Sequence, residues 1–290
     1  MGQYVNSVIQ SIRIRQWYKN VLLFLGIVFA GKLADPCAWM NVALAFSLYC
    51  LLSGSEYLIN DVLDRKRDRL HPTKRNRPIA SGRLSVAAAM TTALVVIAFT
   101  LTISFMYLGT AFFSLSAGFV ALVLIYSLVL KHVVLADVLV LATGFVIRAV
   151  AGAIAIAVTV SPWLIVCTFL LALFLVLEKR WGEVAALQED AQKHRASLAG
   201  LSEWTLTLFV AISCAALLVS YLIYVSVSEF QGLYVTIPFA IYGLFRYMYL
   251  VHEIHRKSDP EELLMDRPML ANLTLWVVLV IAVVAWNTLV

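Results

Sequence analysis

Nine long apolar segments run along this chain, with short polar connections between them. A helix needs about 20 apolar residues to cross a bilayer, and every segment is close to that length. The segments are residues 20–35, 38–59, 86–107, 109–130, 133–158, 162–178, 204–227, 232–251 and 269–289. The pattern predicts an all-α, polytopic membrane protein. The short connections indicate that residues 1–290 form one domain rather than two.

The composition supports the same class of protein. Hydrophobic residues make up 62% of the 290 residues and charged residues 13%, and the mean hydropathy is +0.89. Soluble globular domains have about a quarter of their residues charged. The composition therefore excludes an ordinary soluble domain.

Lysine and arginine residues gather on one side of the predicted membrane. They precede the first segment at Arg13, Arg15 and Lys19, eight of them lie between Arg65 and Arg83, and the opposite side has Lys32 alone. By the positive-inside rule the N-terminus is cytoplasmic and the C-terminus lies outside. The net charge of +5 is then concentrated on the cytoplasmic face, which suits anionic lipid headgroups and phosphorylated substrates.

Residues 12–20 mix cations with aromatic side chains just before the first apolar segment. This mixture predicts an interfacial helix at the level of the lipid headgroups. An aromatic belt with snorkelling cations would explain the same residues.

Oxygen-bearing side chains recur every four residues where the second segment ends. Glu56, Asn60, Asp64 and Asp68 have this spacing, and Asp61 is one step round the helix. Residues four apart share a face of a helix, so we expect one polar stripe that leaves the membrane. Neighbouring carboxylates repel each other unless a cation compensates them, and oxygen ligands of this kind suit Mg²⁺. The stripe therefore predicts a magnesium site.

Two basic runs follow these acids. The cations at residues 65–67 could neutralise the acids without any metal, which would make the stripe structural. Lys74, Arg75 and Arg77 form the second run, and arginine can bind a phosphate through two parallel hydrogen bonds. Lipid headgroups would explain this charge equally well, but the adjacent acids favour a phosphorylated ligand bridged by a metal.

A second polar group lies at the junction of the fourth and fifth segments, with Tyr126, Lys131 and Asp137, and with Arg148 deeper in the apolar stretch. An arginine inside a membrane must face a cavity or a counter-charge. Asp137 and Glu56 are the candidate partners of Arg148. A structural buried ion pair is the alternative to a substrate-binding role.

A third group ends the sixth segment and consists of Glu178, Lys179, Arg180 and Glu183, with Arg195 beyond it. These residues could form an ordinary membrane-exit cap with snorkelling charges. A second metal or phosphate contact is the competing interpretation, because the group lies on the same side of the membrane as the acidic stripe.

Two other sets of residues predict no chemistry. His252 and His255 are three residues apart, whereas a zinc-binding HExxH motif needs a spacing of four, so we expect them in a solvated loop. The four cysteines, Cys37, Cys50, Cys167 and Cys214, have no CxxC spacing, and we expect them to pack as small apolar residues.

The acidic run resembles a known signature. Asn60-Asp61-x-x-Asp64-x-x-x-Asp68 resembles the NDxxDxxxD motif of the UbiA-type intramembrane prenyltransferases. That resemblance implies a superfamily fold of nine helices around a cavity that is open to lipid, with a Mg²⁺-diphosphate bound at its cytoplasmic side.

A second run is more specific. Residues 71–82, with the sequence HPTKRNRPIASG, resemble the decaprenyl-phosphate phosphoribosyltransferase branch of that superfamily, as do residues 15–20, 126–131, 145–148, 179–183 and 259–268. One departure is that Glu178 and Glu183 are five apart where the wider superfamily has a second DxxxD motif. This departure agrees with the branch, in which a basic pair precedes a single glutamate.

The branch implies a reaction in which phosphoribosyl diphosphate donates a 5-phosphoribosyl group to a polyprenyl phosphate of the decaprenyl type and releases diphosphate. It implies Mg²⁺ as cofactor, cell-wall biogenesis as the process and a bacterial plasma membrane as the location, and we expect no nucleic-acid partner. The implied metal ligands are Asn60, Asp64 and Asp68, with Asp61 assisting. The implied substrate-binding residues are Lys19, Lys74, Arg75, Arg77, Tyr126, Lys131, Arg148, Lys179, Arg180 and Glu183.

Two other functions are compatible with parts of the pattern. An aromatic prenyltransferase of the same fold would use similar acids with a polyprenyl diphosphate as donor, but the cationic inner loops favour a donor that has phosphates at both ends. A non-enzymatic lipid carrier would need polar residues through several segments, and these are scarce. The sequence leaves open the length of the lipid chain, the formation of a homo-oligomer, the number of metal ions, and whether Glu178 or Glu183 contacts metal.

Overall fold

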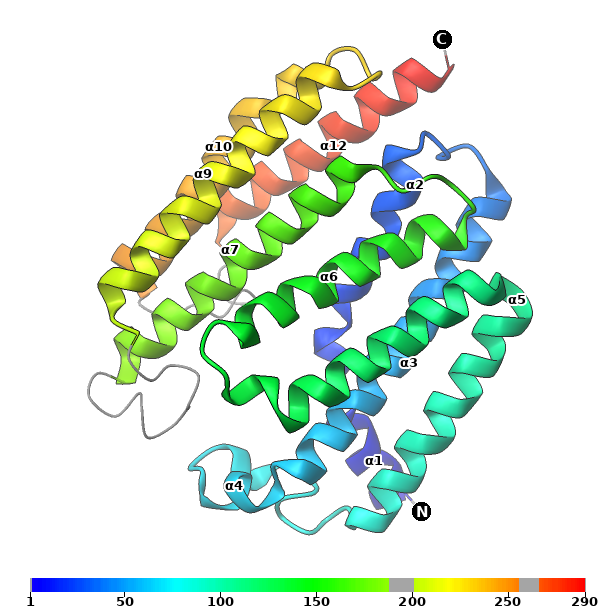
Figure 1. Ribbon diagram of the computed structural model, residues 1–290, viewed down its shortest axis with the longest axis vertical. Helices are drawn as coiled ribbons and strands as arrows, with labels where there is room; N and C mark the ends of the chain where they lie inside the picture. Colours follow the sequence, from blue (N-terminus) through cyan, green and yellow to red (C-terminus); the bar gives the residue numbers. More distant parts are fainter. Residues whose placement is uncertain (1, 188–200, 256–265, 290) are drawn as a thin grey trace. The chain divides into compact units, whose positions relative to one another are not determined.

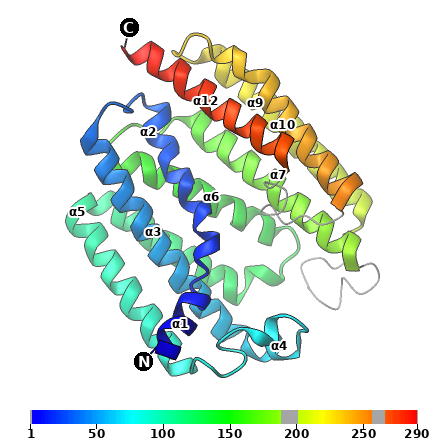
Figure 2. The same cartoon turned by 180° about the vertical axis from the view of Figure 1, so that it is seen from behind.

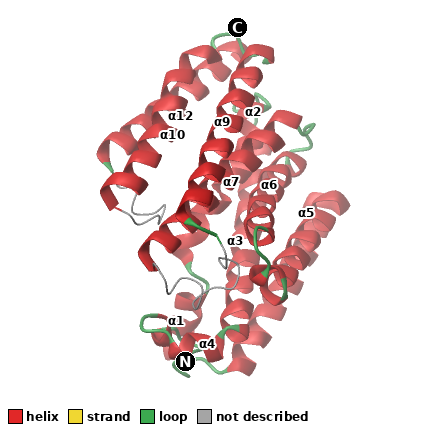
Figure 3. Cartoon of the chain, turned by 60° about the vertical axis from the view of Figure 1, so that its left-hand side comes forward, coloured by secondary structure: helices red, strands yellow, loops and turns green. Residues whose placement is uncertain are grey.

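The computed structural model describes residues 2–187, 201–255 and 266–289. All of the regular elements in these ranges are helical (Figure 1, Figure 3), which confirms the predicted all-α class. Contacts within the chain divide it into two compact units. Unit 1 comprises Met1–Ile27, Asp35–Leu130 and Ile147–Thr159, and unit 2 comprises Val28–Ala34, Lys131–Val146 and Val160–Val290.

Seven helices of the described residues are long and apolar enough to cross a membrane, and the chain is a multi-pass membrane protein. One of them, α5 (Val86–Leu128), contains two of the predicted segments. Gly109 divides it with φ of 84° and ψ of 176°, a backbone conformation that is open almost only to glycine. The two halves of α5 form a hairpin, visible at the right of Figure 1.

Three short helices precede α3 (Pro36–Leu63) in the sequence, and the first two of them lie beside it (Figure 2). They are α1 (Gly2–Ser11), the 3₁₀ helix η1 (Ile14–Phe24) and α2 (Leu25–Phe29). Of the predicted helix over residues 12–20, residues 14–20 lie within η1, and η1 begins there because the backbone adopts a left-handed conformation at Arg13, with φ of 51° and ψ of 60°.

Two glycines let the N-terminal segment pack closely against α6 (Ala136–Ala155), whose residues from Ile147 onward belong to unit 1. A Cβ atom on Gly152 would lie 1.9 Å from the carbonyl oxygen of Leu23, and one on Gly26 would lie 2.9 Å from the backbone nitrogen of Ala153. Small residues permit such backbone approach between membrane helices. This contact brings the C-terminal half of α6 against η1.

The acidic run lies at the end of α3 (Pro36–Leu63), which the side chain of Asp35 caps at the other end by accepting from two backbone N–H groups. The short α4 (Arg65–Leu70) follows, and then the 3₁₀ turn η2 (Lys74–Asn76). The basic loop folds back on α3 because Ile79 and Leu84 are buried in a core with Leu58. Hydrophobic burial therefore positions a highly charged loop.

Unit 2 contains the later helices α7 (Pro162–Leu187), α9 (Glu203–Val227), α10 (Ile237–Tyr249) and α12 (Arg267–Leu289), together with the short elements η3 (Leu130–His132), η6 (Leu233–Thr236) and η7 (Leu250–His255). Phe174, Trp181, Leu206 and Tyr247 are among the side chains that build its core. Helix α7 continues nine residues past the predicted end at residue 178. It continues because Glu178 and Arg180 are buried and paired within the unit, so these charges do not end the helix.

Candidate functional site

The acidic stripe continues across the boundary between two helices at Asp64. This residue ends α3 and precedes α4, yet its N–H bonds to the carbonyl of Asn60 at 2.9 Å and its carbonyl accepts from the N–H of Asp68 at 2.8 Å. The four-residue hydrogen-bonding pattern therefore continues through the bend. Asn60 and Asp64 are half-buried, and Asp68 is buried.

Beside this stripe lies an acid–arginine cluster of Asp61, Asp68, Arg13 and Arg77. Nη1 of Arg77 donates to Oδ1 of Asp61 at 3.1 Å and to Oδ2 of Asp68 at 2.7 Å. The same Oδ1 of Asp61 accepts from Nη2 of Arg13. Both carboxylates are buried, while the arginine side chains are 27% and 26% exposed. The structure thus brings together three predicted site residues, Asp61, Asp68 and Arg77, and places Asp61 at the centre.

Sequence reasoning missed Arg13 as a member of the site. Its guanidinium carbon lies 4.8 Å from the centre of the Tyr57 ring, so a stacking contact supplements the ion pair with Asp61. Its place in the cation-rich segment before the first apolar stretch was the available signal, but that signal also fits a lipid-facing arginine. The contact joins residues 48 positions apart.

The basic loop presents its cations differently. Lys74 and Arg75 are exposed, whereas Arg77 is half-buried in the acid–arginine cluster. His71 shapes the turn by accepting at Nδ1 from the N–H of Thr73, 3.2 Å away. The loop therefore offers two exposed cations next to one that is anchored to acids.

Arg148 lies in a buried polar group of unit 1. Its Nε donates to Oδ1 of Asn20 at 2.8 Å, and its guanidinium carbon lies 4.7 Å from the centre of the Phe119 ring. Of the two partners predicted for it, Glu56 interacts with it electrostatically. Asn20 is 1% exposed, and sequence reasoning assigned it no role.

Glu56 is buried one helical turn before Asn60. Within the described part of the chain, its Oε1 has no hydrogen-bond partner, and the charged group that it interacts with is Arg148. The stripe of four therefore has two parts: Glu56 belongs to the buried polar group, and the other members belong to the helix end.

Unit 2 has its own buried ion pair. Nε of Arg180 donates to Oδ2 of Asp137 at 3.0 Å, and its Nη1 donates to both carboxylate oxygens of Glu183 at 2.9 and 2.7 Å. Asp137 is 1% exposed and Arg180 is 2% exposed. Asp137, which was predicted as a partner of Arg148, thus forms an ion pair with Arg180. The predicted site residues Arg180 and Glu183 lie together.

The prediction of a solvated loop is wrong for His252. This residue lies in the π-helical turn η7, and its ring centre is 4.0 Å from that of Trp181. Its Nε2 is 3.1 Å from Oε2 of Glu178, which is fully buried. Burial of Glu178 explains the pairing, because a buried carboxylate needs a hydrogen-bonding partner.

The remaining predicted residues lie on different elements. Lys19 is half-buried on η1, with its ammonium nitrogen 5.9 Å from the centre of the Tyr18 ring. Tyr126 on α5, Lys131 on η3 and Lys179 on α7 are also half-buried. Arg195 and residues 259–265 lie outside the described residues.

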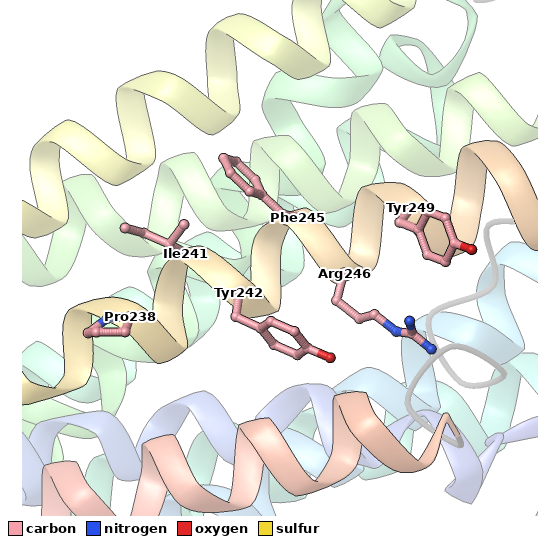
Figure 4. Close-up of a pocket in the computed structure, with 6 residues that line it drawn as sticks. All are labelled: Pro238, Ile241, Tyr242, Phe245, Arg246 and Tyr249. Atoms are coloured by element: carbon pink, nitrogen blue, oxygen red, sulfur yellow. The ribbon is translucent and has the colours of Figure 1, made fainter.

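A groove of about 580 Å³ follows one helix, α10. All of its six lining side chains project from that helix (Figure 4), and they are Pro238, Ile241, Tyr242, Phe245, Arg246 and Tyr249. Arg246 is the only ionic group among them, and it binds both carboxylate oxygens of Asp266, at 3.2 and 3.0 Å. The groove includes none of the predicted site residues.

The helix end has oxygen-bearing side chains of the chemical type that binds Mg²⁺. Within the described ranges, no three Asp, Glu, His or Cys side chains form a complete metal site. Mg²⁺ is usually held by one or two carboxylates together with waters and substrate phosphates, so a complete protein cage is not needed. Asn60, Asp64 and Asp68 carry oxygen atoms of the kind that would bind such an ion.

Comparison with known proteins shows the family to which the chain belongs. A sequence model of the UbiA prenyltransferase family matches residues 21–276. The chain is 33% identical over 219 residues to a decaprenyl-phosphate phosphoribosyltransferase of Corynebacterium glutamicum, covering 74% of this chain and 66% of that one. It is 34% identical over 223 residues to the protein of the same name from Mycolicibacterium smegmatis, covering 75% of this chain and 69% of that one.

The fold also has solved counterparts. A UbiA homologue from Archaeoglobus fulgidus, bound to DMAPP and Mg²⁺, aligns with a TM-score of 0.73 over 96% of this chain and 99% of that one, at 18% identity. At this level of identity the likeness shows the fold alone.

Proposed function

Because the chain belongs to the UbiA prenyltransferase family, we propose that it is a membrane transferase that moves a 5-phosphoribosyl group from phosphoribosyl diphosphate to a polyprenyl phosphate. The similarity to the two decaprenyl-phosphate phosphoribosyltransferases carries the assignment of the substrates. The acid–arginine cluster next to exposed cations supports a phosphorylated donor, because it combines oxygen ligands with guanidinium groups.

Asn60, Asp64 and Asp68 would hold Mg²⁺ at the end of α3, as the donor set of this helix end allows. A bound Mg²⁺ supplies positive charge for the diphosphate as negative charge builds up on it. The A. fulgidus homologue bound to Mg²⁺ and DMAPP supports the use of a divalent ion in this fold.

The cations of the chain would bind and orient the two substrates. Arg77, Lys74 and Arg75 come from one loop beside the acids, so they can contact the diphosphate of the donor. Lys19, Lys131 and Arg180 add charge for the other phosphates, and Tyr126, Arg148, Lys179 and Glu183 complete the proposed set. Groups that hold donor and acceptor lower the entropic cost of bringing them together.

In the proposed reaction, an oxygen of the polyprenyl phosphate attacks C1 of the ribose. The bond between C1 and the diphosphate oxygen breaks, and the diphosphate leaves with the bonding electrons. The attacking phosphate oxygen is already anionic, so the chain needs no strong general base. By analogy with glycosyl transfer, direct displacement inverts C1 and passes through a transition state with oxocarbenium character.

The alternative is an aromatic prenyltransferase with a polyprenyl diphosphate donor. The bound DMAPP of the A. fulgidus homologue favours it. In that reaction the diphosphate is attached to the lipid, and the donor has no group that corresponds to the 5-phosphate of phosphoribosyl diphosphate. The surplus of cations in the inner loops therefore favours the ribosyl donor.

We place the reaction at the cytoplasmic face of a bacterial plasma membrane, since the basic residues predict that orientation. We propose that residues 1–290 form a single catalytic domain. Cell-wall precursor synthesis is the corresponding process.

The deciding experiment uses purified protein, Mg²⁺, labelled phosphoribosyl diphosphate and a polyprenyl phosphate. Transfer of label to the organic phase is the expected result. Asp64→Asn should abolish it, whereas Glu229→Gln, which removes an exposed carboxylate on another segment, should not. No transfer by the unaltered protein, together with product from a polyprenyl diphosphate and an aromatic acid, would assign the alternative function.

A further inference from the structure

We propose that Asp61 is a positioning residue that holds the guanidiniums of Arg13 and Arg77 for the phosphates of the donor, and that it is not a ligand of the divalent ion. The inference rests on the proposed function only in taking a diphosphate as ligand. It adds Arg13 to the phosphate-binding residues and gives the two neighbouring acids, Asp61 and Asp64, different tasks.

The hydrogen bonds of Asp61 argue against metal ligation. Its Oδ1 accepts from both Arg13 and Arg77, and the side chain is only 2% exposed. A magnesium ion would approach its ligand oxygen to about 2.0–2.1 Å. At this oxygen it would lie against two guanidiniums, and in a poorly solvated place such like charges repel strongly.

The same bonds fix two cations that arrive from distant parts of the chain. Arg13 lies between α1 and η1 and has a left-handed backbone conformation, and Arg77 directly follows the η2 turn. Tyr57 adds a stacking contact to Arg13. A guanidinium has five N–H donors, and among the described residues the carboxylate bonds of Arg77 use Nη1 alone. The other terminal nitrogen of each partly exposed guanidinium, Nη1 of Arg13 and Nη2 of Arg77, is therefore available for phosphate oxygens.

The position of Asp68 explains why Arg77 needs Asp61 as a second carboxylate partner. It shares Nη1 of Arg77 with Asp61, and it is also one of the proposed ligands of the divalent ion. An ion at Asp68 would weaken the bond from Arg77 to that carboxylate by repulsion. Asp61 would still hold Arg77 at the helix end, so ion and arginine could act on the same diphosphate.

The test compares Asp61→Asn with Asp64→Asn in the full-length protein, using two probes that contain no sugar. The first is Mn²⁺ alone, followed by its electron paramagnetic resonance signal, and the second is inorganic diphosphate with Mg²⁺, followed by calorimetry. Asp61→Asn should weaken diphosphate binding about 10- to 100-fold, as expected for the loss of charged hydrogen bonds, and leave Mn²⁺ affinity unchanged. Asp64→Asn should weaken Mn²⁺ binding.

Two results would overturn the proposal. One is that Asp61→Asn loses Mn²⁺ affinity as severely as Asp64→Asn, which would make Asp61 an ion ligand. The other is unchanged diphosphate affinity in Asp61→Asn, which would make its ion pairs purely structural. Asp61→Glu, which keeps the negative charge, should recover part of the diphosphate affinity.

Arg13→Gln provides a second route if Asp61→Asn does not fold, because Arg13 is partly exposed. It should weaken diphosphate binding without changing Mn²⁺ affinity, and unchanged diphosphate affinity would refute the role of Arg13. With phosphoribosyl diphosphate as donor, both variants should raise KM more than they lower kcat. Failure of the proposed sugar transfer would leave the two binding measurements intact, so the two ideas fail separately.

Discussion

Nε of Arg148 donates a 2.8 Å hydrogen bond to Oδ1 of Asn20, a residue 128 positions away in the sequence. Both side chains are buried in unit 1. Ser53 and Cys50 of α3 also face Asn20, as donor and acceptor respectively. The amide therefore connects η1, α3 and α6 at one point.

Asn20→Ala should lower the stability of the folded protein. The change leaves the buried Nε of Arg148 without this acceptor, and such a loss costs about 1–3 kcal/mol. Thermal unfolding in detergent should show a lower midpoint. Thr102→Ala is the matched control, because Thr102 is exposed and its hydroxyl donates to the carbonyl of Ala98 in its own helix. An equal shift in the two variants would contradict the proposed importance of Asn20.

Gly152→Ala should prevent folding or reduce the yield of folded protein severely. The added Cβ would meet the backbone oxygen of Leu23 at 1.9 Å, and a backbone atom cannot move aside as a side chain can. Gly118→Ala is the control, since a Cβ there meets nothing within 4 Å. In an open helical position, alanine is favoured over glycine by about 0.5–1 kcal/mol. Size-exclusion profiles of the two variants distinguish them, and normal behaviour of Gly152→Ala would refute the close packing.

Arg180→Gln should destabilise the protein more than the double change Asp137→Asn with Arg180→Gln. The single change removes a guanidinium that compensates the buried Asp137 carboxylate, and breaking a buried pair costs about 3–5 kcal/mol. The double change removes both charges, while Glu183 is 27% exposed and keeps access to water. Thermal midpoints of the three proteins provide the measurement. A double variant as unstable as the single one would mean that lost packing, and not charge, is responsible.

Removal of divalent ions should abolish transfer and leave the fold nearly unchanged. Asp61 and Asp68 have arginine partners within the protein, so their charges are compensated without an ion. Activity and thermal midpoint are measured before and after treatment with a chelator, and Mg²⁺ is then restored. Unfolding of the chelated protein would show instead that an ion holds the helix end together.

Eight of the nine apolar segments and the acidic run could be predicted from the sequence because both depend on neighbouring residues. The first segment, residues 20–35, instead falls in η1, the short α2 and the turn after it. Burial of about 20 apolar residues selects a membrane helix whatever its partners are, and this was enough for the all-α class. A spacing of four places Asn60, Asp64 and Asp68 on one face of a helix. The prediction ended the sixth segment too early, at residue 178, because it took the charges of Glu178 and Arg180 as the edge of the membrane. The sequence does not show that both would be buried and paired.

The contacts between distant segments were decided by the tertiary structure alone. Asp61 could be assigned to the site from its motif, but Arg13, 48 residues away, could not be recognised as its partner. His252 likewise meets Glu178 over a separation of 74 residues. The physical reason is that helical periodicity specifies which side chains share a face, whereas the packing of whole helices determines which faces meet and which buried charges find each other.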